Sequence, residues 1–337
     1  MDKKNEENLI YYLTKTKEYC PELVHLFYPM TRLALDYLYV FDDLFDDNDV
    51  IVFDDFPVQK TLDLVCQFLN NYDQSYLDKF NKAFKDGTID IFYKEFITDE
   101  KYRLDIPISI ENEENSSINV HLCETFEDGG VIIHEFFHFT NSKGFGVRNV
   151  FTELISIYME LKYYKFLQDK GYSIDSFYKE LYLRLKNTYI SSDNISYSGS
   201  ILDVYENTNS ITKDSILFMD KYRDRYEDNL DNLLDFSSSD EFTECIFDFH
   251  VDVSYLLGCV IALNLLKNEK LSDIKIKYIN ENINSLSIEE ILRILDIDLD
   301  NYQELIDCCK DLYDKAEGVL NESNNNNRSY IYRKNKT

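Results

Sequence analysis

The sequence predicts a mainly α-helical protein with a small β-hairpin or sheet beside one helix that carries two histidines. Apolar residues recur at helical spacing along most of the chain, as at Leu62, Val65 and Phe68. Two short stretches, 106–110 and 117–122, instead alternate apolar and polar residues around a turn rich in Glu and Asn. Helical spacing then returns and continues to about residue 320. The hairpin is therefore expected to separate two helical regions.

The region before the hairpin, residues 1–105, is expected to form a helical N-terminal lobe. Leu23 and Leu26 are examples of its apolar residues at helical spacing. Pro21 and Pro57 interrupt this spacing, and proline commonly ends or begins a helix. This lobe is thus predicted to consist of several helices without strands.

Helix starts are easiest to locate near the C-terminal end of the chain. Ser287 followed by Glu290 fits a capping box, in which each side chain accepts a hydrogen bond from the backbone of the other residue. Residues 321–337 contain four consecutive asparagines and end in basic residues. Such a polar segment cannot bury much apolar surface, so the tail is expected to be disordered.

The charge of the chain restricts its partners. Its 337 residues include 35 Lys and Arg and 63 Asp and Glu, which gives a formal net charge of −28. A surface of this sign repels nucleic acids and anionic membranes. We therefore expect neither a nucleic-acid nor a membrane partner, and we expect neutral or cationic ligands.

The cysteines and the N-terminus favour a cytoplasmic location. The seven cysteines are odd in number and include no C-x-x-C pair, which is typical of free thiols in a reducing compartment. The N-terminus lacks the apolar core of a signal peptide. The longest apolar run, 253–266, is too short to span a bilayer. The sequence does not indicate the oligomeric state.

The segment 134–138 reads His-Glu-Phe-Phe-His and follows an apolar lead-in. On a helix, His134 and His138 lie one turn apart on the same face, so their imidazoles can share one metal ion. Two imidazoles suit Zn²⁺, and Glu135 between them can serve as a general base. The alternative is an ordinary helix without a metal site, in which these five residues occur in this order by chance. The scarcity of histidine, five in the chain, argues against it.

A third metal ligand is expected on the next helix, which begins near residue 149. Glu153, Ser156 and Glu160 lie on one face of this otherwise apolar helix. Carboxylates in such a position need a reason to be buried. Glu153 as a ligand, with Glu160 accepting the second N–H of a ligand histidine, supplies that reason. Alternatively, Glu153 is a surface residue favoured near a helix start by the helix dipole.

These segments together resemble one family of zinc peptidases. The stretch from Glu153 to Glu160 is similar to the E-x-P-S-x-x-x-E signature of the thimet oligopeptidase and oligoendopeptidase F family, whose first Glu is the third zinc ligand. The segment from Tyr255 through Gly258 to Ala262 is similar to the family's Y-x-x-G-x-x-x-A helix. The chain thus resembles a shortened, divergent member of these H-E-x-x-H metallopeptidases of the gluzincin type.

The resemblance implies a zincin-like metallopeptidase fold for residues 106–320, with one Zn²⁺ per chain and a peptide as substrate. It implies that Tyr255 donates a hydrogen bond to the reaction's oxyanion, with His250 as a second candidate. The segment Asn119, Val120 and His121 resembles the family's edge strand, which can pair with an extended peptide. A core position for Tyr255 and a partly exposed strand position for His121 are the simpler alternatives.

The sequence also departs from the family pattern. Ile155 stands where the signature usually has proline, and the interval between His138 and Glu153 is shorter than usual. If Tyr255 is matched to the family's second catalytic tyrosine, the usual histidine and first tyrosine fall near Thr243 and Asp248. The N-terminal region is also much shorter than the family's helical lobe.

The predicted function is zinc-dependent hydrolysis of peptide bonds. The substrate is either a range of oligopeptides or one partner or leader peptide, and the sequence does not separate these. The incomplete match around residues 243–255 leaves one alternative of another class. In that alternative the chain is a catalytically weak or inactive relative that acts as a peptide-binding module.

Overall fold

The computed structural model describes residues 3–45, 53–93, 109–112, 117–141, 149–172, 175–222 and 230–325, and they are mostly helical. The helices before the sheet are α1 (Lys3–Tyr19), α2 (Pro21–Val24), α3 (Phe27–Phe41), α4 (Val58–Tyr72) and α5 (Gln74–Lys85). The strands are β1 (Ile89–Tyr93), β2 (Ser109–Asn112) and β3 (Ser117–Leu122). The helices after them are α6 (Glu127–Asn141), α7 (Asn149–Asp169), α8 (Ser176–Thr208), α9 (Lys213–Phe218), α11 (Leu230–Phe236), α12 (Phe242–Leu265), the 3-10 helix η3 (Leu266–Asn268), α13 (Glu269–Asn282), α14 (Ile288–Leu295) and α15 (Gln303–Asn325).

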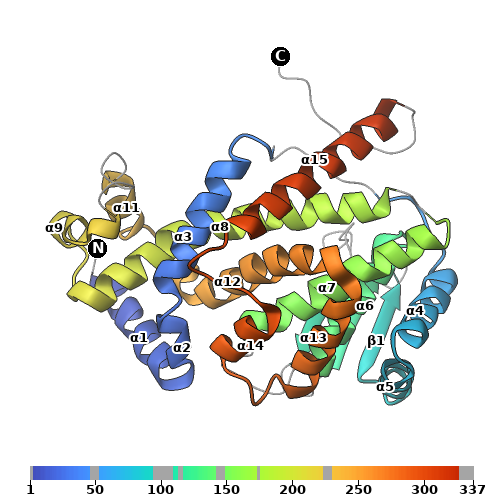
Figure 1. Cartoon of the computed structure of the whole chain (residues 1–337). Helices are drawn as coiled ribbons and strands as arrows, with labels where there is room; N and C mark the ends of the chain where they lie inside the picture. Colours follow the sequence, from blue (N-terminus) through green and yellow to red (C-terminus); the bar gives the residue numbers. More distant parts are fainter. Residues whose placement is uncertain are drawn as a thin grey trace.

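Three long helices form the centre of the molecule. Helices α7, α8 and α12 pack against one another, and α3 and α15 also lie against α8 (Figure 1). Helix α7 carries apolar side chains on every side, interrupted by Glu153, Ser156 and Glu160, and all described side chains of residues 150–161 are buried. A helix that buries apolar side chains on every side belongs in the interior of a protein. The site-bearing segments therefore lie at the core rather than on a surface layer.

One helical segment, Phe242–Asn282, is long and apolar enough to cross a membrane by length and composition alone. Most of its apolar window, 72%, is buried inside the protein. The central packing of α12 against α7 and α8 accounts for this apolar composition.

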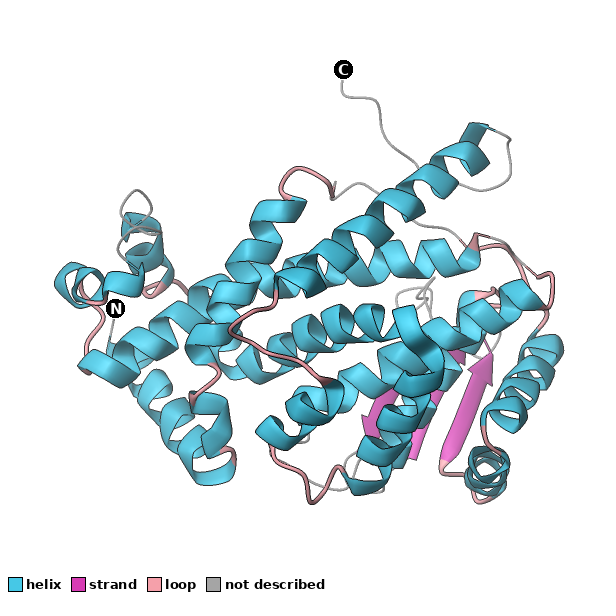
Figure 2. Ribbon diagram, viewed as in Figure 1, coloured by secondary structure: helices cyan, strands magenta, loops and turns pink. Residues whose placement is uncertain are grey.

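The sheet has the strand order β1-β3-β2 and lies beside α4, α5 and α6 (Figure 2). Strand β3 pairs with β1 in parallel, with Ile89 opposite Ile118, and with β2 in the antiparallel sense, with Ser109 opposite Val120. Residues 89–93 were expected to belong to an all-helical lobe, and this expectation was wrong. The proposed boundary near residue 105 accordingly falls between two strands of one sheet.

Helix α6 lies between the sheet and α7, and helices α4 and α5 complete its surroundings. Phe136 and Phe137 of α6 are buried and contact Tyr76 of α5, and Phe80 packs edge-on against Phe136. Residues from before the sheet thus support the helix that carries both histidines.

The C-terminal helices test two expectations. The capping box at Ser287 and Glu290 is confirmed: each backbone N–H donates to the other side chain, at 2.9 and 3.1 Å. Helix α15 continues to Asn325, so the prediction of disorder from residue 321 was wrong for residues 321–325. The remainder of the predicted tail lies outside the described residues.

Candidate metal centre

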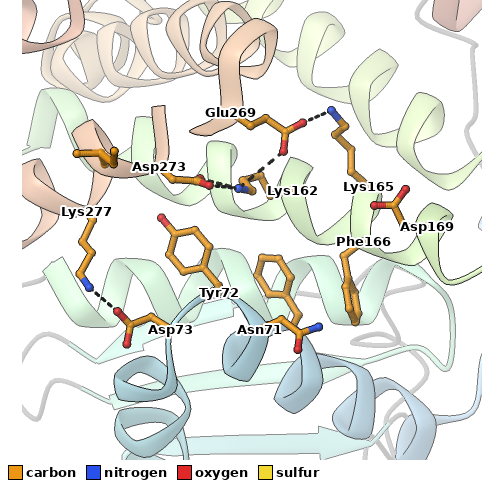
Figure 3. Close-up of a pocket in the computed structure, with 12 residues that line it drawn as sticks. Asn71, Tyr72, Asp73, Lys162, Lys165, Phe166, Asp169, Glu269, Asp273 and Lys277 are labelled. Atoms are coloured by element: carbon orange, nitrogen blue, oxygen red, sulfur yellow. Dashed lines mark hydrogen bonds and ion pairs between the residues drawn. The ribbon is translucent and has the colours of Figure 1, made fainter. Parts of the chain in front are cut away.

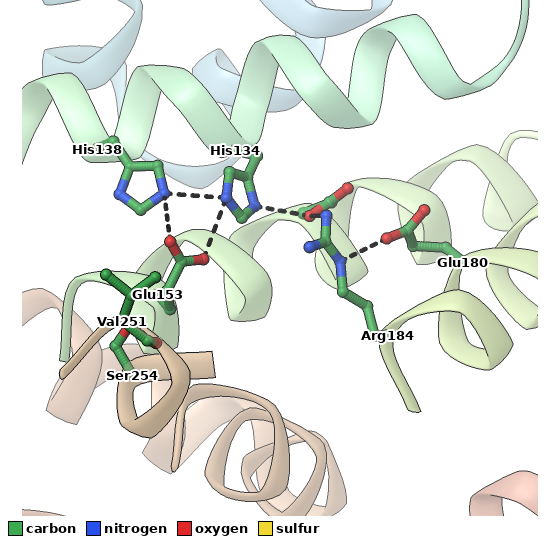
Figure 4. A network of polar contacts seen from close by, with 8 residues as sticks. His134, His138, Glu153, Glu180, Arg184, Val251 and Ser254 are labelled. Atoms are coloured by element: carbon green, nitrogen blue, oxygen red, sulfur yellow. Dashed lines mark hydrogen bonds and ion pairs between the residues drawn. The ribbon is translucent and has the colours of Figure 1, made fainter. Parts of the chain in front are cut away.

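Helix α6 presents His134 and His138 from successive turns of one face (Figure 4). Their Nε2 atoms lie 2.9 Å apart. The start of the helix is fixed by Asp128, whose buried carboxylate accepts hydrogen bonds from the backbone N–H groups of Cys123, Glu124 and Thr125, at 2.8 to 3.2 Å. These hydrogen bonds hold the segment after β3 against the first turn of α6.

Helix α7 brings Glu153 to the same point. Its Oε1 lies 3.2 Å from His138 Nε2, and its Oε2 lies 3.3 Å from His134 Nε2. Glu153 is only 8% exposed, and its buried Oε2 has no hydrogen-bond partner among the described residues. A buried carboxylate oxygen without a donor is costly unless something positive occupies the space beside it.

The three side chains fit a metal ion. His134, His138 and Glu153 offer ligand atoms that all lie within 4.8 Å of one another. Ligand atoms about 2.0–2.1 Å from a tetrahedral Zn²⁺ are separated by about 3.3–3.4 Å. The observed separations of 2.9, 3.2 and 3.3 Å come close to this value. Two histidines and one carboxylate are also the donor set of many hydrolytic zinc sites.

Glu160 orients His134 from the other side of the ring. His134 Nδ1 lies 2.8 Å from Glu160 Oε2, and both side chains are buried. An N–H on Nδ1 leaves the lone pair on Nε2, which faces Glu153 and His138. Burial lowers the pKa of His134, but the negative charges of Glu160 and Glu153 outweigh it and raise the pKa to about 10. The surroundings of this imidazole therefore favour additional positive charge.

A second layer of charges lies behind Glu160 on α8, and sequence reasoning missed it. Arg184 Nη2 donates to Glu160 Oε2 at 2.6 Å, and Arg184 Nε donates to Glu180 Oε1 at 2.6 Å (Figure 4). Burial and the charge of Glu160 raise the pKa of Glu180 to about 8, although Arg184 acts in the opposite direction. Burial, Glu160 and Asp128 raise the pKa of Glu127 to about 7. The i, i+4 spacing of Glu180 and Arg184 was visible in the sequence, but it is also the ordinary pattern of an exposed helical ion pair.

Helix α12 approaches Glu153 unusually closely at Gly258. A Cβ at Gly258 would lie 2.9 Å from Leu154 N, 3.0 Å from Glu153 C and 3.0 Å from Glu153 Cβ. Only glycine lets the two helices come this near. Val251 and Ser254 of the same helix lie beside Glu153 in Figure 4. The middle of α12, from Val251 to Gly258, therefore runs beside the candidate ligands.

Tyr255 lies one turn before Gly258 on α12, within the electrostatic field of the site. The negative charge of Glu153, together with burial, raises the pKa of the Tyr255 hydroxyl, and Glu135 and Glu160 act in the same direction. The positive charge of Arg184 opposes them. The hydroxyl is thus a neutral hydrogen-bond donor near the candidate ligands.

Glu135 lies between the two histidines in sequence and is partly buried. It is not a member of the group of ligand atoms, and its charge acts on Tyr255. The structure thus leaves the Glu135 carboxylate free of the role of a metal ligand.

His250 does not join the group of ligand atoms. Its Nδ1 lies 3.0 Å from the carbonyl oxygen of Phe247 in its own helix, and burial lowers its pKa. His250 and Tyr255 are five positions apart in the sequence. This spacing corresponds to a rotation of about 140° around the helix axis. The two residues therefore lie on different faces of α12.

The strand that carries Asn119, Val120 and His121 was expected to be an edge strand, and this expectation was wrong; contact of these residues with substrate stays a prediction. Strand β3 is the central strand, because β1 pairs with it from residue 118 to 122 and β2 pairs with it from residue 117 to 120. The Val120 side chain is 1% exposed and belongs to the core. The backbone of Asn119 and Val120 is consequently already paired on both sides. The side chains of Asn119 and His121 lie outside the described residues.

A hollow of about 410 Å³ lies away from the histidines, between α4, α7 and α13 (Figure 3). Each of its three lysines pairs with an acidic side chain. The pairs are Lys162 with Asp273 at 2.5 Å, Lys165 with Glu269, and Lys277 with Asp73. These ion pairs already use the lysine charges, so the hollow offers no unmatched cation to a ligand. We interpret it as a junction between helices.

Comparison with protein-family models and with curated protein sequences finds no match. Among solved structures, the chain is similar to a protein described as an oligoendopeptidase F from Bacillus anthracis str. Ames, with 13% identity and a TM-score of 0.46 over 94% of this chain and 56% of the other. It is also similar to PZ peptidase A with an inhibitor, with 13% identity and a TM-score of 0.41 over 94% of this chain and 58% of the other. The chain thus spans little more than half the length of these two proteins.

Proposed function

We propose that the chain is a zinc-dependent metallopeptidase that hydrolyses peptide bonds in oligopeptides or in one partner or leader peptide. The observation that carries this proposal is the convergence of His134, His138 and Glu153, with Glu160 behind His134 and Glu135 outside the ligand group. The carboxylate that we propose for proton transfer is that of Glu135, which directly follows His134 in the sequence. Hydrolysis at a metal ion needs such a base.

Zn²⁺ bound at this group would supply a Lewis acid that lowers the pKa of water and polarises the peptide carbonyl. Glu135 is the general base in this proposal. It accepts a proton from the attacking water and later delivers it to the leaving amine. Its position in the sequence, directly after one ligand and three residues before the other, keeps it on the helix that carries both histidines.

Tyr255 is proposed to stabilise the oxyanion that forms on the substrate carbonyl. A hydroxyl that remains protonated can donate a hydrogen bond as this charge develops. The pKa of Tyr255 is raised by Glu153 and by burial, which keeps the donor proton in place. His250 is the second candidate, and it would need a local rearrangement because its described hydrogen bond is directed to Phe247.

The charge of the chain bears on the substrate. A formal net charge of −28 favours neutral or cationic peptides over acidic ones. No nucleic-acid or membrane partner is proposed, and a cytoplasmic location remains a prediction from the cysteines.

The proposal is tested by metal analysis and by cleavage of a peptide library. The protein is purified without chelator, its zinc content is measured, and cleavage is compared with that of Glu135→Gln. We expect about one Zn²⁺ per chain in both proteins and cleavage only in the unsubstituted one. The variant keeps the shape of Glu135 but cannot accept the proton.

Three results would count against this function. If the purified protein contains no zinc and binds none when zinc is added, the proposed metal site is wrong. Full activity in Glu135→Gln would remove the proposed mechanism. Zinc binding and peptide binding without cleavage would instead support the inactive, peptide-binding relative.

A further inference from the structure

We propose that Arg184 is a positioning residue of the metal centre, which holds Glu160 against His134 and so sets the affinity for the metal. This inference rests on the proposed zinc site and goes beyond it, because Arg184 hydrogen-bonds to Glu160 and Glu180 and is not one of the three candidate ligands. Arg184 contacts Glu160, and Glu160 in turn contacts His134, so Arg184 affects the metal ligand only indirectly. Glu180 completes the unit by orienting Arg184.

One oxygen atom connects Arg184 to the ligand histidine. Glu160 Oε2 lies 2.8 Å from His134 Nδ1 and 2.6 Å from Arg184 Nη2. The position of this oxygen is therefore fixed by two hydrogen bonds. A carboxylate held in this way also fixes the rotation of the imidazole, and with it the direction of the Nε2 lone pair.

Arg184 also has a fixed orientation of its own. Its Nε donates to Glu180 Oε1 at 2.6 Å, while Nη2 is directed to Glu160. The guanidinium is planar, so these two bonds determine its plane as well as its place. A lysine has one charged nitrogen on a flexible stem and cannot reproduce two bonds at fixed angles.

Burial makes this pairing important. Glu160 and Glu180 are 1% and 3% exposed, and Glu127 also acts on both electrostatically. Arg184 is the positive charge that hydrogen-bonds to two of these carboxylates. Its removal would leave Glu160 with its hydrogen bond to His134 but without the ion pair to Arg184, beside other buried acids, and a buried carboxylate that loses such a pair is drawn toward water or another donor. Glu160 would then no longer be held against His134.

The expected effect appears in metal affinity. Loss of a group that orients a metal ligand typically lowers metal affinity about 10–100-fold. We expect Arg184→Met to weaken zinc binding by about tenfold or more, and Arg184→Lys to recover part of this loss. Arg32→Met is the matched control. Arg32 is also partly buried, and it bonds to the carbonyl of Leu299 rather than to this site.

The experiment measures the zinc dissociation constant by competition with a chelating dye. The proteins are the unsubstituted chain, Arg184→Met, Glu160→Gln, the double variant and Arg32→Met, each checked for folding by circular dichroism. If Arg184 acts through Glu160, the double variant binds zinc within about twofold of Glu160→Gln alone. Arg32→Met is expected to leave zinc affinity unchanged.

Two results would overturn the inference. One is a folded Arg184→Met with the zinc affinity of the unsubstituted chain. The other is full additivity with Glu160→Gln, which would mean that Arg184 does not act through that carboxylate. If Arg184→Met does not fold, the zinc affinity of Glu180→Gln tests the inference instead. That variant keeps Arg184 but loses its orienting bond, so an unchanged zinc affinity would overturn the inference and a weakened one would support it.

The outcome for Arg184 is distinguishable from the outcome for the proposed function. If the unsubstituted chain binds zinc and the variants bind it with the same affinity, only the proposed role of Arg184 is wrong. If zinc binding depends on Arg184 but no peptide is cleaved, only the proposed peptidase activity is wrong. Failure of the unsubstituted chain to bind zinc removes the metal site on which both depend.

Discussion

Gly258→Ala tests the close contact between α12 and α7, the helix that carries Glu153, the proposed third metal ligand. The added Cβ would lie 2.9 Å from the backbone nitrogen of Leu154 and 3.0 Å from two atoms of Glu153. These neighbours belong mostly to the backbone of a central helix, so they cannot turn aside as the end of a long side chain would. Either α12 or α7 must shift locally, and Glu153 lies at the point of contact.

The size of the effect follows from two opposing contributions. Overpacking in a well-packed core typically costs about 1–3 kcal/mol. Alanine is preferred over glycine within a helix by about 0.8–1.0 kcal/mol, which offsets part of this cost. We therefore expect a net loss of unfolding free energy of up to about 2 kcal/mol. If the metal-free protein instead relieves the strain by a shift that the bound metal does not allow, stability changes little and the strain opposes binding, which corresponds to an affinity loss of about 5–150-fold.

The assay combines thermal unfolding of the metal-free protein with zinc titration by dye competition. Gly318→Ala is the matched control, because Gly318 lies within α15 and a Cβ there meets nothing within 4 Å. That substitution should raise stability by up to about 1 kcal/mol and leave zinc affinity unchanged. If Gly258→Ala behaves like Gly318→Ala in both measurements, the reasoning about the α7–α12 contact is refuted.

Three further substitutions or treatments address the site itself. Glu153→Ala should lower zinc affinity more than Glu160→Ala, since a ligand is lost in the first case and an orienting group in the second; titration of both variants checks the order, and the reverse order would contradict the assignment of Glu153. Tyr255→Phe should lower turnover by about 10²-fold with little change in substrate binding, because it removes one oxyanion donor; steady-state kinetics would show an unchanged rate if the hydroxyl has no such role. Removal of zinc by a chelator should lower the free energy of unfolding by about 4 kcal/mol relative to protein with free zinc at 1,000 times its dissociation constant; an unchanged melting temperature would speak against a specific site.

The convergence of the two histidines could be predicted from the sequence because its geometry is local. Residues four apart on a helix share a face whatever the rest of the chain does, so His134 and His138 needed only a helix to converge. The capping box at Ser287 is equally local and was predicted correctly. Glu153 needed one assumption more, that the next helix folds back on the first, and its burial on an apolar helix supported that assumption.

The sheet could not be predicted in the same way. Strand β1 is short, and its partner β3 lies more than twenty residues further along the chain. Parallel pairing of this kind depends on contacts that no local pattern encodes, and propensity for short strands is readily overridden by tertiary context. The edge position predicted for Asn119 and Val120 was wrong for this reason, because the missed strand occupies that edge.

By itself, the sequence determined which residues share a helical face, and so it determined that two imidazoles and a carboxylate were available for one metal ion. Only the tertiary structure decided what surrounds them. Arg184 pairs with Glu160 because α8 packs beside α7, and Gly258 meets Glu153 because α12 crosses α7 there. The spacing along one helix is set by covalent geometry, whereas contacts between helices are set by how their side chains pack together.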